Sequence, residues 1–191
     1  MNYKVLELGP GVSPVNQNRL NKDLNQNNTY TIESIDYYTK NKPTYYHNLD
    51  KIPWPIKPNT YDIVYSSHVL EHVIDLSKNI DEIYRILKKD GITIIKMPHA
   101  SCGYAWGHPT HKRVAAYNTF DYFGRNHEKY NKTKGFDVIK KELNYHRLGF
   151  FGKIIKKLAN INSKTQFIFE RFLVGYIGGF DEIVFVLKKI N

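Results

Sequence analysis

The 191-residue sequence contains a single cysteine, Cys102, and no uninterrupted apolar run that approaches the ~18 residues needed to span a membrane. One cysteine excludes an intrachain disulfide and gives no sign of an oxidising compartment. The chain begins directly with an apolar segment typical of a strand, so we expect neither a signal peptide nor a membrane-spanning helix. These absences predict a cytoplasmic protein.

The sequence also lacks long basic runs, although its formal net charge is +10, from 28 Lys and Arg against 18 Asp and Glu. Such an excess would attract nucleic acid, an anionic membrane surface or an anionic substrate. Lys, Asn, Ile and Tyr are abundant throughout, which is equally typical of a biased genome, so the partner stays open. The length suits one α/β domain that spans residues 1–191.

The most informative stretch is the apolar segment 3–8 with the glycine-rich turn that follows it. The short run of strand formers suits a strand buried on both faces of a parallel sheet. Gly9 and Gly11 can adopt positive φ and let the backbone approach a ligand closely. Glu7 places a carboxylate at the end of this strand, the edge where open α/β sheets bind ligands.

Hydrophobic periodicity and turn residues predict the remaining elements. We expect an α-helix that continues through Lys88 and Lys89 and stops at Gly91, followed by a buried strand. The last two strands are expected to pair antiparallel. The predicted strands after the first are 29–35, a short one near Tyr46, 62–65, 92–97, 136–145 and 182–190, and the helices are 15–28 and one from Leu76 onward.

Two of these segments resemble a known family. Glu7-Leu-Gly-Pro-Gly is similar to the first motif of class I S-adenosylmethionine methyltransferases, and Tyr61-Asp-Ile-Val-Tyr-Ser-Ser-His-Val-Leu-Glu-His resembles their fourth-strand motif. The resemblance, of the small methyltransferase type 11 kind, covers nearly the whole chain. It implies an α/β enzyme of Rossmann-like fold, with a mostly parallel seven-stranded sheet, an antiparallel last strand and helices on both faces.

The resemblance also implies the cofactor and the residues that hold it. Asp36, at the end of the second strand, would accept hydrogen bonds from the ribose hydroxyls. Asn48 stands where the family has an aspartate that bonds the adenine amino group, but its oxygen is still an acceptor. The implied S-adenosylmethionine-binding residues are Glu7, Gly9, Gly11, Asp36, Asn48, Leu49 and Ser66.

His68, Glu71 and His72 have the spacing i, i+3 and i+4, which would place them on one face of a helix. Two imidazoles and a carboxylate are typical ligands of Zn, Mn or Fe, so these residues are candidate ligands of a divalent metal, and a fourth ligand could come from the loop that holds His99, His108 and His111. Two O-methyltransferase groups, acting on small-RNA 3′ ends and on ubiquinone-precursor catechols, have a similar arrangement with glutamate in place of His68. Without metal, His68 or a loop histidine such as His111 is the candidate general base.

The acceptor is expected to bind at the irregular loop 100–113 and at the insertion 150–179 before the last strand. Flat aromatic side chains suit a sugar ring, a base or a quinone, and basic ones suit a phosphate, although the aromatics could equally pack a lid. In the insertion, aromatic residues alternate with lysines, a pattern that could rest on an anionic membrane. The candidate acceptor residues are Tyr104, Trp106, His108, His111, Lys112 and Arg113.

Histidines near the cofactor edge favour an oxygen acceptor, so the leading hypothesis is O-methylation of a hydroxyl on a small molecule or glycan. A nucleic-acid ribose and a lipid or quinone hydroxyl are the alternatives. Two hypotheses come from other classes. One is a catalytically degenerate methyltransferase fold that serves as a binding protein, suggested by Asn48 and Pro14. The other is a zinc peptidase with the H-x-x-E-H motif, which is disfavoured because such enzymes place it within a long helix.

Overall fold

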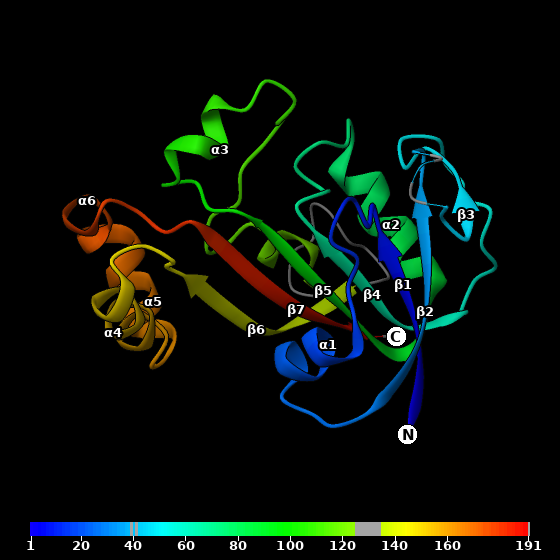
Figure 1. The fold of residues 1–191 in the computed structure, drawn as a ribbon, viewed down its shortest axis with the longest axis horizontal. Helices are drawn as coiled ribbons and strands as arrows, with labels where there is room; N and C mark the ends of the chain where they lie inside the picture. The colour runs from blue at the N-terminus through cyan, green and yellow to red at the C-terminus, as the bar shows by residue number, and fades with distance from the viewer. Residues whose placement is uncertain (39, 41, 125–134, 191) are drawn as a thin grey trace.

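A computed structural model describes residues 1–38, 40, 42–124 and 135–190, and its centre is a seven-stranded sheet of order β3-β2-β1-β4-β5-β7-β6 (Figure 1). The first five strands in this order, β3, β2, β1, β4 and β5, are parallel to one another, whereas β7 is antiparallel to both β5 and β6. The predicted mostly parallel sheet is thereby confirmed. The strands are β1 (Asn2–Leu8), β2 (Thr29–Asp36), β3 (Tyr45–Tyr46), β4 (Tyr61–Ser67), β5 (Leu87–Pro98), β6 (Gly135–Asn144) and β7 (Glu182–Ile190).

Helices cover both faces of this sheet, as expected. Successive residues of a strand point to opposite faces, and Val5 of β1 packs in one apolar cluster with Leu20 whereas Leu6 packs in the other with Ile80 and Ile83. Leu20 lies on α1 (Gln17–Leu24), and both isoleucines lie on α2 (Leu76–Ile86). The remaining helical segments are α3 (Gly103–Gly107), η2 (Asp121–Phe123), α4 (Gly149–Ala159), α5 (Ser163–Ile168), the π-helical η3 (Phe169–Leu173) and α6 (Val174–Ile177).

The C-terminal end of α2 differs from the prediction. The helix ends at Ile86, and Leu87 already pairs with Tyr61 of β4 in the sheet. Lys88 lies in β5, where its Nζ is 2.9 Å from Asp62 Oδ1, so it does not sit in a last helical turn. Gly91 is needed for a different reason, because a Cβ there would lie only 2.9 Å from the backbone oxygen of Lys88.

The proline-rich loop between β3 and β4 is irregular, as its sequence predicts, yet it is firmly attached to α2. Trp54 is buried, and its backbone N–H donates to Glu82 Oε2 at 2.7 Å. The guanidinium of Arg85 binds Glu82 and donates to the backbone oxygens of Trp54 and Ile56. One ion pair on α2 therefore satisfies three polar groups of the loop.

The insertion before β7 forms α4 to α6, which Figure 1 shows beyond the carboxyl end of β6. The side chain of Asn160 bonds both the N–H and the oxygen of Leu143, and Gln166 donates to the oxygen of Lys141. Side-chain amides thus fix these helices to β6. No helix among the described residues is long and apolar enough to cross a membrane.

Arg85→Met should lower the free energy of unfolding by about 2–4 kcal/mol, because Glu82 and two carbonyl oxygens lose their charged donor in a largely buried setting. Denaturant unfolding measures the change. Lys78→Met, which removes the exposed partner of Asp75, is the control and should cost about 0.5 kcal/mol or less. Equal losses in the two variants would contradict the structural role of Arg85.

Candidate functional site

The glycine-rich turn is held by its neighbours on both sides. Gly9 N–H donates to the oxygen of Ile35 at 2.9 Å, which extends the pairing of β1 with β2 past the end of the strand. Gly9 and Gly11 have φ of 54° and 53°, the left-handed region that glycine adopts at low cost. A Cβ on Gly9 would lie 2.9 Å from Cγ2 of Val69. Both positions therefore favour glycine because of their positive φ, and position 9 also lacks room for a Cβ.

A cavity of about 780 Å³ opens at the carboxyl ends of β1, β2 and β4. Five of the seven residues expected to bind the cofactor line it: Gly9, Gly11, Asp36, Asn48 and Leu49. Several lining residues were missed, although two of them, Tyr37 and Tyr38, directly follow Asp36. The others missed are Ile35, Asp50, Val69, Val73, Ile74, Pro109 and Thr110.

Glu7 and Ser66, the two other expected cofactor residues, do not line the cavity. Glu7 is buried beneath the turn, where its Oε1 accepts the N–H of Val15 at 2.8 Å. Burial raises the pKa of the Glu7 carboxyl, while the Val15 N–H and the charge of Arg19 oppose that rise. Ser66 is fully buried within β4. Glu7 thus supports the turn by binding the backbone of Val15, and it does not line the cavity.

Asp36 and Asn48 both use side-chain oxygens to build local turns. Asp36, which is buried at the end of β2, accepts the N–H of Tyr38 at 2.9 Å through Oδ1. Asn48 Oδ1 accepts the N–H of Asp50 at 2.9 Å. Since each such oxygen has two lone pairs, a further hydrogen bond from a ligand in the cavity is compatible with these turns.

The His68-x-x-Glu71-His72 segment is a turn and not the predicted helix. His68 has φ of 56°, His72 N–H bonds the oxygen of Val69, and α2 starts only at Leu76, after the capping side chain of Asp75. The left-handed residue at position 68 breaks the helical path, and histidine tolerates this region better than most residues. Because zinc peptidases need this motif within a helix, the turn removes the peptidase alternative.

His68 lies between two carboxylates. Its Nε2 is 2.7 Å from Glu182 Oε2 and its Nδ1 is 3.4 Å from Glu71 Oε1. The hydrogen bond with Glu182, and then the 3.4 Å ion pair with Glu71, raise the pKa of His68 to about 9. Burial raises the pKa of Glu182, but His68 and Asn144 outweigh it and hold that pKa below its usual value. His68 is therefore protonated at neutral pH, which argues against the general-base role expected from the sequence.

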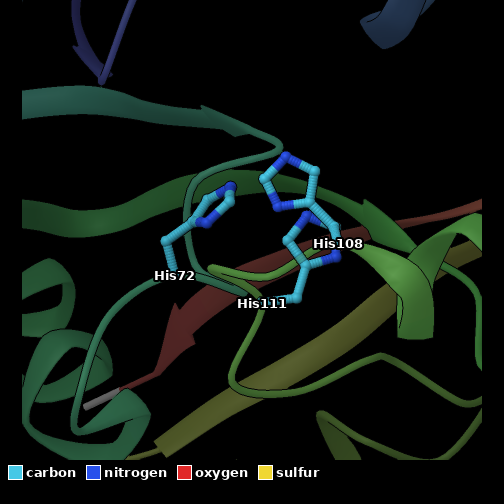
Figure 2. A group of neighbouring side chains, drawn as sticks. All are labelled: His72, His108 and His111. Carbon is cyan, nitrogen blue, oxygen red and sulfur yellow. The ribbon is translucent and has the colours of Figure 1, made fainter.

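A different trio of histidines comes together at the rim of the cavity. One ring nitrogen each of His72, His108 and His111 lies within 4.8 Å of the other two, and Figure 2 shows the rings turned toward one another. Burial, and to a smaller extent the other two histidines, lower the pKa of His72. Of the predicted set His68, Glu71 and His72, only His72 belongs to this group, and His108 and His111 come from the loop that was expected to supply a fourth ligand. His99, a further candidate, is buried against Glu170.

The predicted acceptor residues divide into exposed and structural ones. Tyr104 and Trp106 of α3 are 90% and 67% exposed, and Lys112 lines the cavity. Arg113 does not face a ligand, because its guanidinium donates to the backbone oxygens of Leu70, Val73 and Ile74. Burial also lowers the pKa of Arg113. Its expected phosphate-binding role is replaced by support of the turn 68–74.

Glu182 is the residue of this region that sequence reasoning missed. It lies 114 residues from His68, and no local motif marks it. β7 begins at Glu182, opposite Pro98 of β5, and β5 is the neighbour of β4. Sheet order alone therefore brings it to His68.

Comparisons with known proteins agree with this architecture. The family model described as a methyltransferase domain matches residues 3–150. The chain belongs to the methyltransferase-domain family. This methyltransferase is of the S-adenosylmethionine-dependent class, as its sequence resemblance implied. The comparison with curated proteins gave no match.

Two solved structures illustrate the similarity of fold. A SAM-dependent methyltransferase from Archaeoglobus fulgidus superposes with a TM-score of 0.62 at 17% identity, covering 97% of this chain and 85% of that one. A Listeria monocytogenes protein assigned to the same class gives 0.57 at 14% identity, covering 99% and 92%. At such low identity these likenesses establish the fold of this methyltransferase and leave its acceptor open.

Glu182→Gln should return the pKa of His68 toward its ordinary value, because the hydrogen bond with that carboxylate is the largest cause of the rise. Two-dimensional NMR titration of the histidine rings measures the shift. A raised folded-state pKa stabilises the fold below the unfolded value near 6.5, and this stabilisation is lost as pH rises through about 9. The variant should therefore lose stability mainly below pH 9. Glu142→Gln, in a carboxylate paired with Lys140 and Lys156, should leave the His68 titration unchanged.

Proposed function

We propose that this methyltransferase transfers the methyl group of S-adenosylmethionine to a hydroxyl oxygen of a small molecule or glycan. The observation that carries the proposal is one continuous cavity, lined by Gly9, Gly11 and Asp36 together with His68, His72 and Lys112. The first group suits a nucleoside-type cofactor, and the second brings imidazole and ammonium groups to the same space. Such a cavity lets cofactor and acceptor meet.

The lining residues fit the cofactor in shape and charge. A Cβ on Gly11 would meet nothing closer than the oxygen of Gly9 at 3.9 Å, so the turn leaves open space above its backbone. Asp36 offers a carboxylate for ribose hydroxyls, and Leu49 with Ile74 offers apolar surface for the adenine ring. Asn48 would accept from the adenine amino group.

The reaction asks the protein mainly to position its reactants. When bound, S-adenosylmethionine supplies a methyl group on a positively charged sulfur, which leaves as a neutral thioether as the acceptor oxygen forms its bond to that carbon. The turn 68–72 sets one wall of the place where the acceptor would lie, and His68 there, with its ring nitrogens turned toward Glu182 and Glu71, would contribute positive charge. The hydroxyl proton must pass to another group.

The histidines at the rim are the candidates to receive that proton. A neutral imidazole can accept a proton at the nitrogen that carries no hydrogen, and burial lowers the pKa of His72, which lines the cavity. His111 Nδ1 is 2.7 Å from the oxygen of Ala105, an acceptor only, so Nδ1 carries the hydrogen and Nε2 keeps the free lone pair. His111 therefore remains the candidate base of the metal-free protein, whereas His68 is assigned an electrostatic role.

Asp36→Asn should weaken S-adenosylmethionine binding by about tenfold or more, since a charged acceptor for the ribose hydroxyls contributes about 1.5–3 kcal/mol. Asparagine keeps an oxygen for the Tyr38 N–H, so the fold should be unaffected. Calorimetric titration with S-adenosylmethionine and its demethylated product measures the change. Asp90→Asn, an exposed aspartate paired with Lys188, is the control. Unchanged affinity in Asp36→Asn would overturn the assigned cofactor site.

A second candidate acceptor is a hydroxyl on a lipid, favoured by the surface of α4 to α6. Phe150 and Phe151 are 72% and 69% exposed, and basic side chains are interleaved with such aromatics. Exposed large apolar side chains concentrated in one short segment are typical of a region that contacts a partner. This insertion surface consists of Phe150, Phe151, Ile154, Leu158, Ile161, Phe167, Ile168, Phe172 and Tyr176, with Lys153, Lys157, Lys164 and Arg171.

An anionic membrane matches this combination of apolar area and positive charge. Vesicles that contain phosphatidylserine should bind the protein, and the binding should fall as salt is raised. The pair Phe150→Ser with Phe151→Ser should abolish most of it, whereas Tyr46→Ser, at an exposed aromatic on β3, should not. Failure to bind vesicles would leave the soluble acceptor as the proposal, and tight salt-sensitive binding to RNA would redirect it to a nucleic-acid ribose.

A further inference from the structure

We propose that His72, His108 and His111 form a binding site for a divalent transition metal, with zinc as the best-fitting ion, at the acceptor end of the cavity. The three residues come from two segments, the turn after β4 and the loop after α3 (Figure 2). Binding of the metal itself is independent of the proposed function. Its role toward the acceptor rests on that function.

The distances suit three-fold coordination after small side-chain adjustments. One nitrogen of each ring lies within 4.8 Å of the other two. Nitrogens around a tetrahedral zinc are roughly 3.3 Å apart, given zinc–nitrogen bonds of about 2.0–2.1 Å. Each ring therefore needs to move by only about 1 Å, and the side chain of His108 is exposed. His108 and His111 already stack, with ring centroids 4.3 Å apart.

Hydrogen bonds orient the rings in the manner seen around bound metals, where the second ring nitrogen is held by an oxygen. His111 Nδ1 bonds the oxygen of Ala105 at 2.7 Å. Nδ1 of His72 and Nδ1 of His108 lie 2.8 Å and 3.0 Å from the same hydroxyl, that of Thr110. With an ion on Nε2 of each ring, both Nδ1 atoms carry a hydrogen, and the hydroxyl oxygen of Thr110 has two lone pairs with which to accept from both.

The loop is fixed to the turn by hydrogen bonds to backbone oxygens of the turn, so the position of the site does not depend on the three histidine side chains alone. Lys112 N–H donates to the oxygen of Glu71 at 2.8 Å, and the guanidinium of Arg113 donates to three oxygens of residues 70–74. These bonds bring position 111 beside position 72. A preformed scaffold of this kind lowers the ordering cost of binding an ion.

Charge around the cluster also favours a cation. Glu71, adjacent to His72, has a fully buried carboxylate, and neither oxygen has a hydrogen-bond partner within the described chain. Its nearest positive group is His68, at 3.4 Å. Glu71 shares the charge of His68 with Glu182, so its negative charge also acts on His72 and favours a dication beside that ring.

Three imidazoles identify the class of ion. Imidazole suits Zn, Cu, Fe and Ni, whereas Mg and Ca prefer oxygen ligands. Three protein ligands leave a fourth position open, the arrangement of catalytic zinc sites. His72 and Thr110 line the cavity, so the open position would be within reach of an acceptor hydroxyl, whose oxygen such an ion would bind and acidify.

The test uses the full chain without a histidine tag, first stripped with a chelator. Zinc titration against a competing chromophoric chelator should show about one equivalent bound, and Co²⁺ should give the visible absorption of a four- or five-coordinate site. His108→Ala should weaken zinc binding at least tenfold, and Thr110→Val should weaken it by about 10–100-fold, the usual effect of losing a group that orients ligands. His146→Ala, an exposed histidine outside the cluster, is the matched control and should bind as the native chain does.

Two readouts keep this proposal separate from the assigned cofactor site. Calorimetry with S-adenosylmethionine on the same variants should give unchanged affinity, because the cluster lies outside the cofactor-binding group. Absent zinc binding, or equal binding by the native chain and His108→Ala, would overturn the metal site even if the cofactor binds. Zinc binding without cofactor binding would retain the metal site and overturn the proposed function.

Discussion

The parallel register of β1 between β2 and β4 is the constraint on which the rest of the structure depends. Leu8 pairs with Ile35 on one side and with Ser66 on the other, so all three strands end at one level. The segments that follow these three strands therefore lie together at the same edge of the sheet. The residues that follow are the glycine turn, Asp36 with its tyrosines, and the turn that begins at His68. The cavity exists because these three ends coincide.

That edge also concentrates charge. β7 runs antiparallel to β5, so its first residue, Glu182, lies beside the strand ends and reaches His68. Glu71 approaches the same imidazole from the opposite side. Two buried carboxylates thus share one cation, which fixes the protonated state of His68 and distinguishes it from the histidines at the rim. One cavity wall therefore contains imidazoles in different protonation states.

Hydrogen bonds, mostly from side chains to backbone groups, hold the loop 100–113 in place beside the cavity. The segment 110–113 runs along the turn 68–74, where Lys112 and Arg113 bond its carbonyl oxygens. At the start of the same loop, the hydroxyl of Ser101 accepts the N–H of Phe180, and the carboxylate of Glu170 bonds the ring of His99. The start of the loop therefore contacts the insertion and the residue that follows it. An acceptor bound at the site that we propose would consequently touch elements far apart in sequence. This explains why members of one fold can differ in acceptor while they share a cofactor.

Local patterns in the sequence determined the strands, the glycine turn, Asp36 and the family, because strand formers, glycines and an acidic strand end act through their immediate neighbours. Sequence alone misjudged the helical spacing of His68, Glu71 and His72, since one left-handed residue changes the path of the chain. It also assigned Arg113 to a ligand, although the guanidinium bonds carbonyl oxygens some 40 residues away. Glu182 beside His68 and the grouping of His72 with His108 and His111 were decided only by the tertiary structure, because strand order and interloop hydrogen bonds bring together residues that no local pattern connects.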